Sequence, residues 1–340
     1  MDTSANRYTE YQIANMNILN MVNWDVMHPD IVITMGGHRM LEFKPTFRKL
    51  KNKMEHWHVS PNGEVSDPYF CQTDIIECKQ DFFFRRMSEL AQKSNHSYYE
   101  EWATVEKRLL KQQPKAEDFE FSAVYAIKKL IENLPSKSLF HISNSDSIRI
   151  SSSFLLPKNI NVYCNRGTCG IDGSMSTYVA QSYVTNRPSF LVIGDLSFFY
   201  DMNGLWNHYI NKNTRIMLIN NGGGAILNFG AYKTVNVPNK LPNTAASHNV
   251  SAKGWVESIG FTYFAARTEE EFNSVMPKFV SSDSDTPILL EVYTKMDDDI
   301  NERGKILSSY KSSSEQTKDS MKKIIAQPIK GILKGIVKRD

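Results

Sequence analysis

The chain has 340 residues, of which 41% are hydrophobic, 11% aromatic and 23% charged, and its formal net charge is +3. This composition excludes a mainly disordered or fibrous protein, and the length favours two compact units over one. Basic residues are scattered among acidic ones except near the C-terminus, and no apolar run approaches the ~20 residues that cross a bilayer. We therefore expect a cytoplasmic protein that binds no nucleic acid.

The first strong pattern is the run DIVITM at 30–35, which is rich in β-branched residues and is followed by two glycines. It predicts a buried strand that ends in a tight turn. Residues 56–59 and 73–78 predict two further strands, a basic helix is expected between the first two strands, and 81–91 predicts another helix. Residues 1–106 are thus expected to form a partial central Rossmann-like domain, because the chain before the first strand is too short to supply the missing elements.

The charged segment 107–118 contains a proline and is expected to be a linker. Residues 119–311 form the second expected domain. Its expected helices are 121–134, 201–211 and 269–280, and a glycine-rich turn followed by a helix is expected at 167–183. Its expected strands are 139–143, 160–163, 190–193, 216–219 and 288–293. Strands that alternate with helices predict an α/β fold, in which a parallel sheet is covered by helices on both faces.

Residues 312–340 combine lysines with isoleucines in a basic amphipathic pattern, which is typical of a membrane-surface or partner helix. Pro328, Gly331 and Gly335 interrupt this pattern. Because these residues disfavour helix, we expect a solvated or loosely docked tail, with only weak contact to a membrane surface.

Two polar motifs follow successive strands of the second domain. The sequence GDLS follows the strand at 190–193, and NNGGG follows the strand at 216–219. The carboxyl ends of parallel strands meet at one edge of a sheet, where loops and helix N-termini form anion-binding crevices. Mg²⁺ takes oxygen ligands and often bridges a carboxylate to phosphates. Asp195 offers a carboxylate, Asn221 an amide oxygen and Gly223 a backbone carbonyl, so we expect a site for a diphosphate and a divalent metal.

A Gly-Asp pair followed further along by paired asparagines is the signature of thiamine-diphosphate-dependent enzymes, and this sequence resembles it. The forms GDLSFFYDMNGL and INNGGGAI, with leucine in place of the usual third glycine, are similar to those of the menaquinone-pathway 2-succinyl-5-enolpyruvyl-6-hydroxy-3-cyclohexene-1-carboxylate synthases. An NRG…GIDG…ST segment from Asn165 and an NS…R segment from Asn144 agree. The resemblance extends over about 30–293, and its specific motifs lie between 144 and 226.

The resemblance implies a role for individual residues. The implied metal ligands are Asp195, Asn221 and the carbonyl of Gly223. The residues implied to face the substrates are Ser145, Arg149 and Arg166. The residues implied to bind the coenzyme are Ile171, Gly194, Asp195, Leu196, Ser197, Asn221, Gly223, Gly224 and Ile226. Ile171 would be the apolar wedge that keeps the coenzyme bent, and the two arginines suit carboxylates because a guanidinium binds them in bidentate fashion.

The implied cofactors are thiamine diphosphate and Mg²⁺ or Mn²⁺. The implied reaction is a transferase reaction that forms a C–C bond: decarboxylation of 2-oxoglutarate, then addition of the resulting carbanion to isochorismate. In such enzymes a glutamate of an N-terminal pyrimidine-binding domain activates the coenzyme, and no residue of this chain matches it. The chain alone is therefore expected to be inactive.

The expected partners are small carboxylate substrates, together with a second copy of the chain or a separate pyrimidine-binding chain. Two alternatives remain open at this point. One is an enzyme with a different carboxylate acceptor, for example in a surface-glycan pathway. The other is a coenzyme-binding remnant without turnover.

Overall fold

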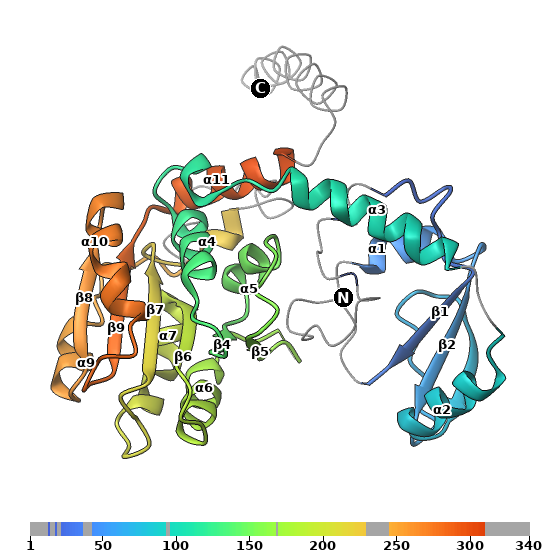
Figure 1. Cartoon of the computed structure of the whole chain (residues 1–340), viewed down its shortest axis with the longest axis horizontal. Coiled ribbons are helices and arrows are strands. Elements are labelled where there is room, and N and C mark those ends of the chain that lie inside the picture. Colours follow the sequence, from blue (N-terminus) through green and yellow to red (C-terminus); the bar gives the residue numbers. More distant parts are fainter. Residues whose placement is uncertain are drawn as a thin grey trace, which may run out of the picture.

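A computed structural model describes residues 13, 18, 22–36, 43–92, 96–167, 169–228 and 245–309. These residues form two parallel sheets with helices packed against them, which confirms the predicted α/β class. Figure 1 shows the smaller sheet, in blue, at one end of the long axis and the larger sheet, in green to orange, at the other. Helix α3 (Ser97–Lys111) runs between them along the top of the view.

The smaller sheet has the strand order β1-β2-β3, and all its strands are parallel. Its elements are β1 (Ile31–Met35), α1 (Lys44–Lys49), β2 (Glu55–Ser60), β3 (Gln72–Glu77) and α2 (Gln80–Leu90). Strand, helix, strand, strand and helix thus follow one another in the predicted order. Their side chains enclose a small apolar core of Phe47, Leu50, Met54 and Tyr69.

The segment expected to be a linker is partly helical. Helix α3 continues to Lys111, and Leu109 is fully buried in the core of the larger unit. Earlier in the same helix, the ring of Trp102 lies 5.7 Å from the ring of Trp24. At 107–111 the segment is therefore helical, and its charges occupy the exposed face of the helix. Only 112–118, which includes the short turn η3 (Ala116–Asp118), follows the helix as a connection, and the domain boundaries stay predictions.

The larger sheet has the strand order β5-β4-β6-β7-β9-β8, and every neighbouring pair is parallel. Its strands are β4 (Leu139–Ile142), β5 (Asn161–Cys164), β6 (Ser189–Gly194), β7 (Thr214–Asn220), β8 (Thr262–Ala266) and β9 (Ile288–Tyr293). The central strands are apolar on both faces: Phe190 and Val192 join one core, and Leu191 and Ile193 join the other. Such strands need cover on both sides, since neither face tolerates water.

Helices supply that cover. One core includes residues of α4 (Ala123–Asn133), α5 (Asp146–Ser151), α10 (Glu269–Val280) and α11 (Met296–Ser309). The other includes residues of α6 (Ser174–Tyr183), α7 (Asp195–Asp201), η4 (Met202–Leu205) and α9 (Lys253–Ser258). The prediction of a parallel sheet with helices on both faces is confirmed.

One helical prediction needs correction. The helix that was expected after the glycine-rich turn is α6, which begins at Ser174, whereas the one expected at 201–211 is displaced toward the N-terminus. Helix α7 starts at Asp195, directly after its strand, and continues through η4 only to Leu205. Beyond it, the side-chain oxygens of Asn207 and Asn211 accept hydrogen bonds from backbone N–H groups two residues on, a local bonding that competes with helix. The α-helices and strands without a sequence prediction are α3, α5, α9, β8 and α11.

Within the described ranges, no helix combines the length and apolarity that crossing a membrane requires. The basic tail at 312–340 lies outside the described residues, so its expected surface or partner contact stays a prediction.

Candidate functional site

The two polar motifs leave the larger sheet side by side. Strands β6 and β7 are neighbours, and Gly194 lies opposite Ile219 in their parallel register. Asp195 therefore emerges next to the glycine-rich turn that follows Asn221. The backbone N–H of Gly223 donates a hydrogen bond to Asp195 Oδ2 at 2.9 Å, which joins the two motifs directly.

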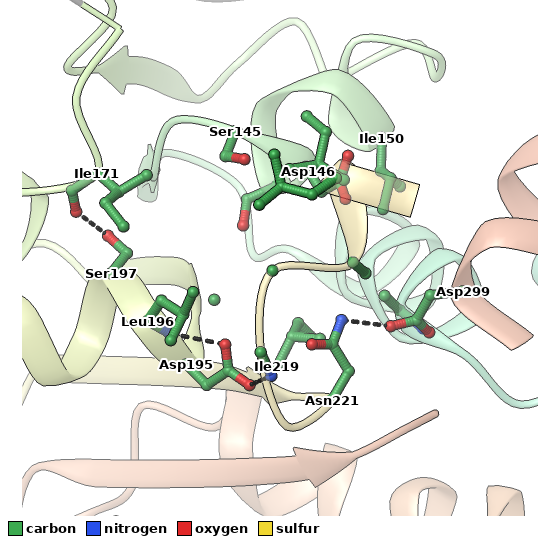
Figure 2. Close-up of a pocket in the computed structure, with 18 of the residues that line it drawn as sticks. Ser145, Asp146, Ile150, Ile171, Asp195, Leu196, Ser197, Ile219, Asn221 and Asp299 are labelled. Atoms are coloured by element: carbon green, nitrogen blue, oxygen red, sulfur yellow. Dashed lines mark hydrogen bonds between the residues drawn. The ribbon is translucent and has the colours of Figure 1, made fainter. Parts of the chain in front are cut away.

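A cavity of about 250 Å³ opens at this edge of the sheet. Ten of the predicted site residues line it: Ser145, Ile171, Gly194, Asp195, Leu196, Ser197, Asn221, Gly223, Gly224 and Ile226. Figure 2 shows the side chains of Ser145, Ile171, Asp195, Leu196, Ser197 and Asn221 around one space. Arg149 and Arg166 do not line the cavity, so their role toward substrates stays a prediction.

The carboxylate of Asp195 is buried and well supplied with donors. Only 2% of the residue is exposed, and Oδ1 accepts a hydrogen bond from the backbone N–H of Leu196 at 2.6 Å. The ring of His248 brings Nε2 to 3.3 Å from Oδ2. Burial raises the pKa of the Asp195 carboxyl, while the N–H donors and His248 oppose that shift. A buried anion at a cavity wall is a good ligand for a cation, because the cation restores the favourable interaction with charge that burial removes.

Asn221 presents its two amide atoms to different surroundings. Its Nδ2 donates a hydrogen bond to Asp299 Oδ2 at 2.7 Å. Its Oδ1 is buried and accepts no hydrogen bond from the described residues. A buried acceptor without a donor is costly, and native proteins rarely keep one without a reason. The orphaned oxygen beside a buried carboxylate fits a divalent cation that takes oxygen ligands.

The backbone conformation of the turn requires glycine at two positions. Gly222 and Gly223 have φ of +78° and +146°, where L side chains are strained. A Cβ on Gly223 would lie 2.5 Å from the carbonyl oxygen of Ala245. The N–H of Gly224 donates to that same carbonyl at 2.7 Å, so the turn packs closely against the backbone.

The wall of the cavity formed by Ile171 and Leu196 is connected to α7 by a hydrogen bond. The hydroxyl of Ser197 donates a hydrogen bond to the carbonyl of Ile171, which connects the GIDG segment to the first turn of the helix (Figure 2). The side chains of Ile171 and Leu196 are thereby held at the cavity. This wall is largely apolar, as expected of a surface that shapes a ring-containing ligand.

Four ionisable residues that were not predicted lie at or beside the cavity: Asp146, His248, Asp299 and Arg303. Arg303 forms an ion pair with Asp146, and burial raises the pKa of Asp299 to about 6. The sequence did indicate the start of the helix that carries Asp299, because three consecutive aspartates at 297–299 are typical of a helix N-terminus. The residues around 297–299 do not indicate that this helix lies beside the cavity.

Among the described residues, no group of three or more His, Cys, Asp or Glu side chains is arranged to hold a metal. A metal in the cavity would therefore depend on one carboxylate, an amide oxygen, backbone carbonyls and a bound ligand. That donor set suits Mg²⁺ or Mn²⁺ bridging to phosphate, and it does not suit zinc, which prefers nitrogen and sulfur.

No family model matches the chain. It is 37% identical over 287 residues to the 2-succinyl-5-enolpyruvyl-6-hydroxy-3-cyclohexene-1-carboxylate synthase of Bacteroides fragilis, a match that covers 84% of this chain and 50% of the relative. The synthases of the same name from Bacteroides thetaiotaomicron and Christiangramia forsetii are 37% and 34% identical over 84% and 81% of the chain, and it covers 50% and 48% of them. The chain thus spans about half the length of the curated relatives that it matches, and within that span it is similar to these synthases.

Proposed function

We propose that the chain carries the diphosphate- and metal-binding half of a thiamine-diphosphate-dependent synthase. One observation carries the proposal: the buried Asp195 carboxylate and the orphaned Oδ1 of Asn221 border the same cavity, at the ends of adjacent strands. The name of the relatives supports 2-succinyl-5-enolpyruvyl-6-hydroxy-3-cyclohexene-1-carboxylate as the product of the complete enzyme. Its proposed substrates are 2-oxoglutarate and isochorismate.

In this proposal, Asp195, Asn221 and the carbonyl of Gly223 hold Mg²⁺ or Mn²⁺, which neutralises the diphosphate. Thiamine diphosphate, when bound, supplies an electron sink for decarboxylation and carbon–carbon bond formation. The chain's own side chains shape the site. Ile171, Leu196 and Ile226 exclude water from the cavity wall.

Ser145, Arg149 and Arg166 are proposed to orient the substrate carboxylates. No residue of the chain is assigned the activation of the coenzyme. We propose that turnover needs a pyrimidine-binding part with its glutamate, supplied by residues of the same polypeptide outside this sequence or by a separate chain.

Calorimetric titration with thiamine diphosphate and Mg²⁺ tests the binding site. Asp195→Asn removes the charge with little change of shape and is expected to weaken binding by about 10- to 100-fold, the scale of a lost charged interaction. Asp201→Asn is the matched control at the other end of α7. Asp201 accepts hydrogen bonds from the N–H and hydroxyl of Ser176 at 2.8 and 2.6 Å and does not line the cavity.

Equal weakening in the two variants would contradict the assignment, as would absence of binding by the wild-type chain both alone and with the pyrimidine-binding half. The reaction itself is tested by mixing the complete assembly with 2-oxoglutarate and isochorismate and identifying the product by mass spectrometry. Turnover only with another carboxylate acceptor would leave the coenzyme assignment standing and overturn the proposed substrate.

A further inference from the structure

Helix α11 supplies a carboxylate, Asp299, that accepts hydrogen bonds from three separate segments beside the cavity. Asp299 is 5% exposed, and its Oδ1 accepts a hydrogen bond from the backbone N–H of Ala123, the first residue of α4, at 2.7 Å. Its Oδ2 accepts from Asn221 Nδ2 at 2.7 Å and from the hydroxyl of Thr294 at 2.9 Å. Figure 2 shows Asp299 and Asn221 facing each other across the edge of the cavity.

The chemistry of these partners leaves the Asn221 amide one orientation. An ionised carboxylate only accepts hydrogen bonds, and the N–H of Ala123 only donates. Asn221 has a donor end and an acceptor end, so the end that faces Asp299 must be its NH₂ group. The amide oxygen is then turned away from Asp299, where it is buried and accepts no hydrogen bond from the described residues.

We propose that Asp299 is a positioning residue that keeps the oxygen of Asn221, and not its NH₂ group, directed at the metal. The inference rests on the function proposed above and adds a residue to it. The two ends of an amide have nearly the same shape, so packing alone selects between them weakly, and hydrogen bonding decides. An inverted amide would offer two N–H donors to a cation, which repel it.

Asparagine at 299 would lose this selectivity, although it has the same size as aspartate. It has one acceptor atom for the Ala123 N–H, and its NH₂ group then faces Asn221. Asn221 would satisfy that donor by turning its own oxygen inward, and its NH₂ group would face the metal. Asp299→Asn is therefore expected to weaken metal binding while the fold is retained.

Exchanging the two side chains should restore the site. In the double variant Asn221→Asp with Asp299→Asn, the asparagine at 299 accepts from Ala123 and donates to the aspartate at 221. A carboxylate at 221 still presents an oxygen to the metal whichever way it turns. The double variant keeps the net charge that this pair has in the wild type. It does not restore the carboxylate at 299 that caps α4. Recovery would therefore report the atom that position 221 presents to the metal and not the cap.

Glu302 provides the matched control on the same helix. It is 3% exposed, and its Oε2 accepts from the backbone N–H of Glu120 at 3.3 Å, just before α4. It does not line the cavity. Glu302→Gln thus removes a buried carboxylate of α11 that accepts a backbone hydrogen bond and has no contact to the proposed metal ligands.

The experiment measures Mn²⁺ binding to the full chain by electron paramagnetic resonance, at a fixed concentration of thiamine diphosphate. Circular dichroism verifies that each variant is folded. We expect Asp299→Asn to raise the apparent Kd for Mn²⁺ at least tenfold, Glu302→Gln to change it less than twofold, and the exchanged pair to return to within about threefold of wild type.

The inference is overturned if folded Asp299→Asn binds Mn²⁺ as tightly as wild type, if Glu302→Gln weakens binding equally, or if the exchanged pair stays as weak as the single variant. In each of these cases wild type still binds Mn²⁺, so the proposed function survives. Failure of the wild-type chain to bind Mn²⁺, alone or with the pyrimidine-binding half, would instead reject both.

Discussion

Alanine at position 223 should separate the backbone requirement of the glycine-rich turn from the chemistry of the cavity. Gly223 has φ of +146°, and a non-glycine residue in such a region costs about 1–3 kcal/mol. The added Cβ would also meet the Ala245 carbonyl at 2.5 Å, whereas ordinary contact begins at 3.4 Å. That oxygen belongs to the backbone and cannot rotate away.

Relief of this clash must move the turn, and two hydrogen bonds are at risk. These are Gly223 N–H to Asp195 at 2.9 Å and Gly224 N–H to Ala245 at 2.7 Å. Backbone strain and partial loss of these bonds, each worth about 1 kcal/mol, together predict that Gly223→Ala lowers the free energy of unfolding by about 2–4 kcal/mol.

Gly224→Ala is the matched control for stability. Its φ is not in the positive range, and its Cβ would meet its nearest neighbours at 3.5 and 3.6 Å, which is ordinary contact. We expect its free energy of unfolding to stay within about 1 kcal/mol of wild type. Urea unfolding followed by circular dichroism measures both variants. Equal stability of the two would refute the reasoning, because it would mean that the turn adapts without cost.

Burial lowers the pKa of His141 from 6.5 to about 4, so between these values the unfolded chain binds a proton that the folded chain does not. The free energy of unfolding, measured in urea, should therefore decrease by about 2 kcal/mol as the pH is lowered from 7.5 to 5, and His141→Gln should abolish this contribution. Ser145 has φ of +76°, and no hydrogen bond of its side chain caps α5. Ser145→Gly should thus be about 1–2 kcal/mol more stable than Ser145→Ala, and equal thermal unfolding of the two would exclude strain there. Arg215 is 2% exposed and donates to the carbonyls of Phe279 and Ser281, so Arg215→Met should cost about 3 kcal/mol of stability, measured in the same way.

Local patterns were sufficient for much of the sheet. The apolar runs that became β6 and β7 are buried on both faces, and runs of that kind specify strands of a parallel sheet whatever lies far away in the chain. The GDLS and NNGGG motifs follow those strands directly, so their meeting at one edge followed from strand order. The helix at 201–211 was misplaced because the asparagines that end it act through side-chain bonds that apolar spacing does not reveal.

The sequence by itself thus determined the layered α/β fold and ten residues that line the cavity. Only the tertiary structure decided what surrounds them. Asp299 lies 78 residues from the amide that it holds, and Arg303 lies 157 residues from Asp146. Such contacts depend on where whole helices pack. A strand or a tight turn is selected by the residues within it, whereas a hydrogen bond between distant segments exists only after the core has brought their backbones together.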